Sequence, residues 1–205
     1  EITYGDWTSA VCSSDLALTV MTTTSFYLIP AYTPTYGRQA LHMGAAEVQL
    51  VTLIVGVSNL FWLPVGGMLT DRFGARPVML LVTLAALATA YPAMSWLVAG
   101  PSVLKLLAVL LLFSVYFGLY NGCLIPLLAE IMPQEIRTTA FSLAFVTATA
   151  GFGGFTPAIC TYLVEQTGNR AAPGLWLSLA ALISLLAAFA VFRVTRPASG
   201  VRAAP

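Results

Sequence analysis

The sequence predicts an all-α membrane protein, a bundle of six transmembrane helices. Hydrophobic residues make up 59% of its 205 residues and charged residues only 8%, whereas charged residues supply about a quarter of an ordinary soluble chain. The mean hydropathy is +0.87. Six apolar stretches follow one another, each near the ~20 residues that an α-helix needs to cross a bilayer. They are 16–35, 48–70, 77–98, 104–131, 138–164 and 172–194.

Residues 1–15 differ in composition from everything that follows. They contain acidic residues but no basic residue and show no helical periodicity, and the string resembles translated sequencing-adapter sequence. We interpret them as a non-native or disordered stretch; the alternative is a genuine polar loop or periplasmic segment. The expected organisation is then a six-helix bundle over 16–194 and a cytoplasmic tail over 195–205.

The apolar stretches differ in polarity, which predicts where each one lies. Stretch 16–35 is rich in hydroxyl groups and contains Pro30 and Pro34, whereas 77–98 and 172–194 are plain. Lipid cannot satisfy freed backbone groups, so polar or interrupted helices must face protein or water. We therefore expect the first, second, fourth and fifth stretches to line a central cavity. Its predicted residues are Tyr27, Tyr116, Tyr120, Asn121, Thr147, Gly151, Gly154 and Pro157.

Each of these residues has a second interpretation. The glycines and the proline of 151–157 indicate either a hinge beside a binding site or close packing of helices through small residues. The tyrosines and Asn121 are donors for a substrate carboxylate or, equally, for hydrogen bonds between helices.

A charged turn separates the second and third stretches. Residues 66–77 read GGMLTDRFGARP. We expect Gly74 to supply the positive φ of a tight turn and Pro77 to occupy the first position of the next helix. The spacing of Gly67, Leu69, Asp71, Arg72, Gly74 and Arg76 resembles the signature loop of the major facilitator superfamily. Ala75 departs from it, because the superfamily loop often has a second basic residue there.

The resemblance implies the C-terminal half of a twelve-helix major facilitator fold, whose partner would be a missing N-terminal six-helix half. The Lys and Arg distribution predicts the orientation, because cytoplasmic loops of membrane proteins are richer in both. One side of the bundle carries six of these residues and the other three. The charged turn and the C-terminus are therefore expected in the cytoplasm, and an even number of spans places the N-terminal end there too.

Charges at the cytoplasmic ends of the predicted helices suggest a gate. Asp71 and Glu130 lie at helix C-termini, whereas Arg76 and Arg137 lie at helix N-termini, so each opposes the dipole of its own helix by ~0.3–1 kcal/mol. Pairing across helices would resolve this misfit: Arg72 or Arg76 with Glu130, and Asp71 with Arg137 or a helix N-terminus. The predicted cytoplasmic gate comprises Gly67, Asp71, Arg72, Gly74, Arg76, Glu130 and Arg137. The alternative is a set of topological anchors.

A second stretch narrows the resemblance. Residues 121–168, together with TTTSFYLIPAYTPTY in 22–36, are similar to the metabolite:proton symporter branch of the superfamily, and within it to citrate and tricarballylate carriers. The resemblance implies proton-coupled symport of a tricarboxylate by alternating access in a bacterial inner membrane. Every acidic and basic residue lies toward the end of its stretch, so the proton-carrying group is expected in the missing half.

Other classes fit less well. Neither paired carboxylates nor a metal-ligand cluster occur within a span, and no nucleophile–base pair surrounds the single histidine, His42. We expect no enzyme, no cofactor and no metal. A net charge of +1 without a basic patch gives no reason to expect nucleic acid. Two alternatives stay open: a carrier of another solute, such as an osmolyte, a sugar or an aromatic acid, and a non-transporting receptor or scaffold.

Overall fold

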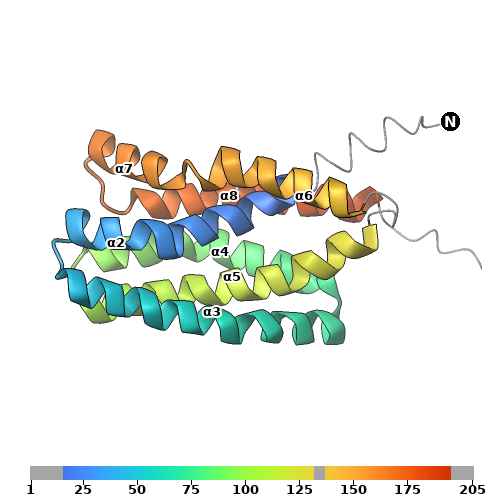
Figure 1. The fold of residues 1–205 in the computed structure, drawn as a ribbon, viewed down its shortest axis with the longest axis horizontal. Coiled ribbons are helices and arrows are strands. Elements are labelled where there is room, and N and C mark those ends of the chain that lie inside the picture. The colour runs from blue at the N-terminus through green and yellow to red at the C-terminus, as the bar shows by residue number, and fades with distance from the viewer. Residues whose placement is uncertain (1–15, 132–136, 195–205) are drawn as a thin grey trace, which may run out of the picture.

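The computed structural model describes residues 16–131 and 137–194 of the chain, and the regular structure within these ranges is helical (Figure 1). The predicted N-terminal stretch 1–15 and the tail 195–205 lie outside the described residues. The first helix spans residues 16–40 and consists of an α-helical part at 16–26 followed by η1, α2 and η2.

The bounds of the remaining elements follow the predicted stretches closely. In chain order the elements after 16–26 are η1 (Tyr27–Tyr32), α2 (Thr33–Thr35), η2 (Tyr36–Ala40), α3 (Ala45–Phe73), α4 (Ala75–Val98), α5 (Val103–Ile131), α6 (Arg137–Ala148), η3 (Thr149–Gly153), α7 (Thr156–Thr167) and α8 (Ala172–Val194).

Within the described residues, four continuous α-helices are long and apolar enough to cross a membrane: α3, α4, α5 and α8. The two other predicted spans are helical but interrupted. Pro30 and Pro34 lack the N–H that a regular α-helix requires, and η1 and η2 of the first helix are π-helical. The fifth span is divided into α6, η3 and α7 at a cluster of glycines. The count of six spans therefore stays a prediction.

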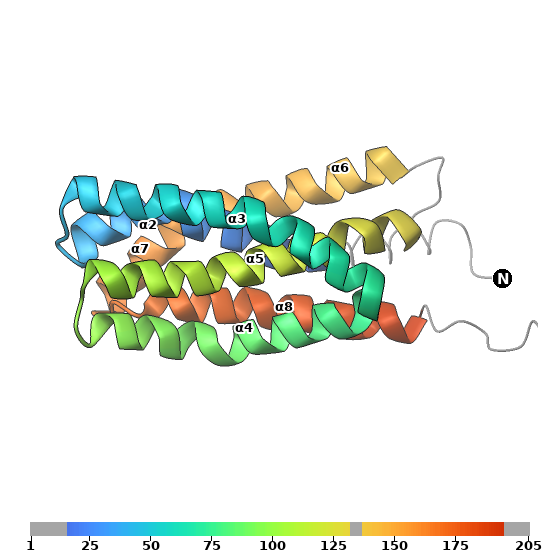
Figure 2. The same ribbon diagram turned by 90° about the horizontal axis from the view of Figure 1, so that it is seen from below.

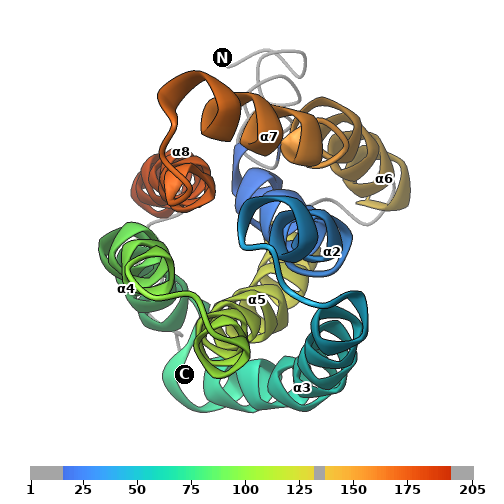
Figure 3. The same ribbon diagram turned by 90° about the vertical axis from the view of Figure 1, so that its left-hand side faces the viewer.

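The helices pack as two tight pairs around the first helix. α3 packs along α5, and α4 packs along α8 and α5 (Figure 2). In the view down the bundle, α4 and α8 lie together on one side, α3 and α6 lie on the other, and the first helix lies between them (Figure 3). The two plain spans are thus neighbours.

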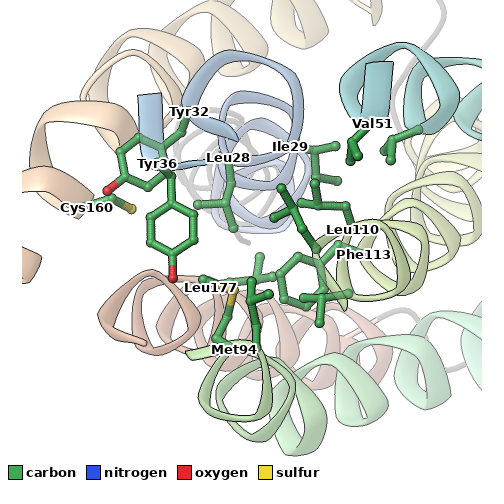
Figure 4. Close-up of a cluster of buried hydrophobic side chains, with 14 of the residues drawn as sticks. Leu28, Ile29, Tyr32, Tyr36, Val51, Met94, Leu110, Phe113, Cys160 and Leu177 are labelled. Carbon is green, nitrogen blue, oxygen red and sulfur yellow. The ribbon is translucent and has the colours of Figure 1, made fainter. Parts of the chain in front are cut away.

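Two buried clusters fill the interior. The far-end core, near the α4–α5 loop, joins the first helix to α3, α5 and α8 through residues such as Leu28, Phe113 and Leu177 (Figure 4). Its Tyr32 and Tyr36 rings pack with their centroids 5.6 Å apart. The hairpin-end core, near Gly74, groups residues of α4, α5 and α8 around Leu18 and Met21 of the first helix. The first helix is consequently anchored in both cores.

Glycines allow α3 and α5 to approach backbone to backbone. A Cβ atom added at Gly122 would lie 2.5 Å from the Gly67 nitrogen and 2.6 Å from the Gly66 carbonyl carbon, and one added at Gly118 would meet Trp62. Gly118 and Gly122 are four residues apart, which is the spacing that lets membrane helices pack closely. This contact fixes α3 against α5 over their hairpin-end halves.

The glycine contact leads to a prediction about stability. Gly122→Ala should lower the free energy of unfolding of the full-length protein by about 1–3 kcal/mol, because the new methyl group overlaps the backbone of α3. Gly56→Ala on α3 is the matched control, since its methyl group would meet nothing within 4 Å. Unfolding of the purified protein in detergent, titrated with SDS, measures both. Equal stability of the two variants would contradict the contact.

Candidate functional site

The charged turn is tighter than the sequence suggested. α3 continues to Phe73 and α4 begins at Ala75, so Gly74 alone joins them. Its φ of 86° confirms the predicted positive φ, and its N–H donates to the Thr70 carbonyl at 2.8 Å. The prediction for Pro77 was wrong by two positions, because α4 already begins at Ala75. Pro77 remains within the first turn, where a backbone N–H lacks an intrahelical partner in any case.

The charges of this turn lie at the surface. Asp71 and Arg72 are exposed in the last turn of α3, and Arg76 is exposed in the first turn of α4. The Arg72 guanidinium lies over the Phe73 ring, 5.5 Å from its centroid. Arg72 suits the negative end of the α3 dipole, whereas Asp71 opposes it. Gly67 has open space where a Cβ atom would lie.

The other half of the predicted gate is described only in its backbone. α5 ends at Ile131 and α6 begins at Arg137, and both of these helix ends lie at the same end of the bundle as the Gly74 turn (Figure 2). The side chains of Glu130 and Arg137 lie outside the described residues. Their pairing with Arg72, Arg76 or Asp71 stays a prediction.

The predicted cavity donors on α5 make hydrogen bonds within the bundle. Tyr116 shares a hydrogen bond of 2.8 Å with Thr89 of α4, and the buried Tyr120 donates to the Leu18 carbonyl of the first helix at 2.8 Å. The Asn121 amide donates to the Phe117 carbonyl of its own helix at 2.8 Å. The structure therefore uses both tyrosines to join helices, the alternative that the sequence left open.

The structure brings Tyr27 to the glycine cluster of the fifth span. A Cβ atom at Gly153 would lie 2.8 Å from Tyr27 Cδ2 and 3.2 Å from Thr23 Cβ, so the glycine makes room for the tyrosine ring. η1 and α7 also contact each other. Thr147, Gly151 and Gly154 are exposed, and Pro157 lies in the first turn of α7.

Three buried hydroxyl groups lack a hydrogen-bond partner among the described residues: Thr22 and Thr24 of the first helix and Thr149 of η3. A buried hydroxyl without a partner costs free energy, so such groups are candidates for contact with water or a ligand. They belong to the same two segments as Tyr27 and Gly153. The run TTTS at 22–25 is the sequence signal that points to them.

Sequence reasoning missed two polar links. Ser114 of α5 donates to Asn59 Oδ1 of α3 at 2.6 Å and contacts Ser58 at 3.1 Å. Ser184 of α8, in a stretch that looked plain, reaches the backbone of the first helix. Isolated serines in apolar helices are a weak signal, because a serine can also bond to its own helix. Within the described part of the chain, no three His, Cys, Asp or Glu side chains gather to hold a metal ion.

The chain is similar to known transporters. Residues 16–205 match the family model described as the Major Facilitator Superfamily. The chain is 53% identical to the citrate-proton symporter of Klebsiella pneumoniae over 89% of its length, and 50% identical to that of Salmonella typhi over 89%. It is 30% identical to the proline/betaine transporter of Salmonella typhimurium over 91% of its length. The chain spans 41%, 42% and 36% of these three relatives.

The contact between Tyr27 and Gly153 leads to a double-mutant prediction. Gly153→Ala should destabilise the full-length protein because the methyl group overlaps the tyrosine ring, and Tyr27→Ala should relieve that overlap. We expect a coupling free energy of about 1 kcal/mol or more between the two changes, measured by SDS titration of the four proteins. In a parallel cycle Gly151→Ala, whose methyl group would meet nothing within 4 Å, should not couple to Tyr27→Ala. Additive effects in the first cycle would show that the contact does not form.

Proposed function

Because the chain belongs to the major facilitator superfamily, we propose that it is part of a secondary active transporter that carries a tricarboxylate together with protons. The observation that carries this proposal is the similarity to two citrate-proton symporters at 53% and 50% identity over 89% of the chain. The proposed substrate is citrate or tricarballylate. The proposed location is the inner membrane of a bacterium.

We further propose that residues 16–194 form a six-helix bundle that packs against a second bundle of the same carrier. The chain is a multi-pass membrane protein with four continuous apolar helices. The interrupted first helix and the α6–α7 segment would supply the other two spans. In this arrangement the Gly74 turn, the N-terminal end of the bundle's chain and the C-terminus face the cytoplasm, as the Lys and Arg distribution suggests. The surrounding partners are lipid and the rest of the carrier.

The energetics of anion uptake favour coupling to protons. Moving an anion inward against an inside-negative potential of ~100 mV opposes about 2.3 kcal/mol per net charge. Co-transported protons cancel part or all of that charge. The proposed mechanism is alternating access, in which two bundles rock about a site near the middle of the membrane.

For the substrate cavity we propose the junction of the first helix and η3. Its support is the contact of Tyr27 with Gly153, the unpartnered hydroxyls of Thr22, Thr24 and Thr149, and the π-helical turns, which are frequent at functional sites. Three other predicted cavity residues lie on α5: Tyr116, Tyr120 and Asn121. In this proposal they support the cavity through the hydrogen bonds described above. Thr147, Gly151, Gly154 and Pro157 complete the proposed wall on the α6–α7 segment.

A second candidate is a carrier of an osmolyte. The 30% identity to the proline/betaine transporter favours it, because that relative also matches 91% of the chain. The hydroxyls and aromatic rings of the proposed cavity suit a zwitterion as well as a carboxylate. We propose the tricarboxylate first because the identity to the citrate-proton symporters is higher.

Uptake by the full-length carrier tests the proposed function. Cells that express it should accumulate labelled citrate or tricarballylate, and a proton uncoupler should reduce accumulation about tenfold or more, because the proton gradient would drive transport. Uptake of labelled betaine by the same cells tests the alternative, an osmolyte carrier. Accumulation of betaine without accumulation of either tricarboxylate would reject the proposed substrate and favour the osmolyte carrier.

The proposed gate predicts a selective effect of Asp71. Asp71→Asn should reduce the initial rate of uptake about tenfold, with KM and the amount of carrier in the membrane nearly unchanged, because the carboxylate would act where the bundles close and not at the substrate. Glu47→Gln is the matched control, an exposed acid in the first turn of the same helix. A near wild-type rate for Asp71→Asn would instead support topological anchors.

A further inference from the structure

One turn of the first helix is bonded by side chains of two other helices. Ser184 of α8 donates from its hydroxyl to the Ala17 carbonyl at 2.9 Å, and Tyr120 of α5 donates to the Leu18 carbonyl at 2.8 Å. Ser184 is fully buried, and Tyr120 is 1% exposed. Both bonds end on backbone carbonyls, the groups that hold the first helix together.

Ser184 also accepts a bond from the same turn. The Met21 N–H donates to Ser184 Oγ at 3.2 Å. In an α-helix the N–H of residue 21 pairs with the carbonyl of residue 17, and Ser184 contacts both of these groups. The Ser184 hydroxyl therefore bonds to both partners of one backbone hydrogen-bond pair of the first helix, the Met21 N–H and the Ala17 carbonyl.

The next two carbonyls of the first helix also accept from a hydroxyl. The Thr23 hydroxyl donates to both, and its Oγ1 lies 3.2 Å from the Thr19 carbonyl oxygen and 3.2 Å from the Val20 carbonyl oxygen. Four consecutive carbonyls, those of residues 17–20, thus lie within hydrogen-bond distance of three hydroxyls, and the Thr23 hydroxyl is shared between the last two carbonyls. Hydroxyls that bond to helix carbonyls, or insert between a carbonyl and its N–H partner, often weaken or bend a helix locally. Among the described residues, this is the turn of the first helix whose backbone groups make the most hydrogen bonds to side-chain hydroxyls.

Beyond this turn the first helix is irregular. η1 contains Pro30, which has no N–H to give to the ladder. The helix is held again at its other end, where Tyr36 donates to the Arg170 carbonyl at 2.6 Å. Tyr27, which touches Gly153, lies between the two attachments.

We propose that Ser184 and Tyr120 are positioning residues for transport, which hold the first helix at residues 17–21 and thereby set the place of Tyr27. The inference rests on the proposed transport function. Neither side chain touches the proposed substrate cavity through its hydroxyl; each acts through the backbone of the first helix. The turn at 17–21 is the hinge about which the first helix moves against α5 and α8.

The Ser184 hydroxyl lies within reach of two carbonyl acceptors of this turn. It lies 2.9 Å from the Ala17 carbonyl and 3.5 Å from the Leu18 carbonyl. A small rotation of the first helix would move the Ser184 hydroxyl from the Ala17 carbonyl to the Leu18 carbonyl. The Ala17 carbonyl and the Met21 N–H would then bond only to each other. Every backbone group stays bonded in both arrangements, which a membrane interior requires.

The test removes the hydroxyl from the full-length carrier. Ser184→Ala should lower the maximal rate of citrate uptake about fivefold or more with KM within about threefold, because reorientation and not substrate contact is affected. Ser178→Ala is the matched control: Ser178 lies on the same helix, but its hydroxyl contacts the Leu87 carbonyl of α4 at 3.5 Å. Its uptake should stay near that of the unsubstituted carrier.

A second measurement does not depend on the substrate. A reporter cysteine at the exposed Thr35, Thr35→Cys, reports the position of the far end of the first helix through its rate of maleimide labelling, while the described native cysteines are buried. Without substrate, Ser184→Ala should change this rate about threefold or more relative to Ser178→Ala. Failure of the unsubstituted carrier to take up citrate would reject the proposed function and leave this labelling test decisive for the hinge.

Two results would overturn the inference. One is a labelling rate and an uptake rate in Ser184→Ala that match those of Ser178→Ala. The other is loss of folded Ser184→Ala carrier from the membrane, because the inference holds that the Met21 N–H and the Ala17 carbonyl satisfy each other once the hydroxyl is removed.

Discussion

The structure depends on one constraint, which is that every backbone group of the first helix must find a hydrogen bond inside an apolar layer. Pro30 and Pro34 remove two N–H donors from this helix, and its backbone responds by widening into π-helical turns. Hydrogen bonds to other parts of the chain hold both ends of the helix: Ser184 and Tyr120 donate to its backbone near the start, and its own Tyr36 donates to the Arg170 carbonyl near the finish. The first helix is therefore held by hydrogen bonds to other parts of the chain in addition to its own backbone hydrogen bonds.

The remaining helices provide the rigid frame that this arrangement needs. α3 and α5 meet through the backbone contact of Gly66 with Gly118 and Gly122, where there is no side chain to adjust, and α4 lies against α8. Close glycine contacts resist sliding because any displacement brings backbone atoms into overlap. The bundle thus combines two helix pairs of fixed geometry with two interrupted segments, the first helix and α6–α7. Those interrupted segments meet at Tyr27 and Gly153, which places the adjustable parts of the fold next to each other.

Local rules predicted much of this fold. A bilayer sets the length of an apolar helix, so the limits of α4, α5 and α8 follow the apolar stretches within two residues. Gly74 was predictable because only a glycine adopts that backbone conformation readily. The continuation of the first helix to Ala40 was missed, because its polar residues read as a loop, whereas they form η2, which contacts α3. The role of Ser184 was also missed: its partner Ala17 is 167 residues away, and no local pattern encodes such a pairing. The same holds for Tyr120, whose hydroxyl suits a carboxylate and a backbone carbonyl equally well.

The positions of the charged residues indicate which part of the proposed transport this bundle would perform and which part the rest of the carrier would perform. The acidic and basic residues lie toward the ends of the helices, so the middle of the bundle offers hydroxyls and aromatic rings instead of a cation. Hydroxyls such as those of Thr22, Thr24 and Thr149 orient a carboxylate but do not neutralise it, and an unneutralised anion in an apolar layer is strongly disfavoured. A tricarboxylate held at this junction would therefore need its charge balanced from the opposite wall or by the protons that travel with it. Under the proposed function, the bundle described here would set shape and orientation through the first helix, and the coupling charge would act from across the cavity.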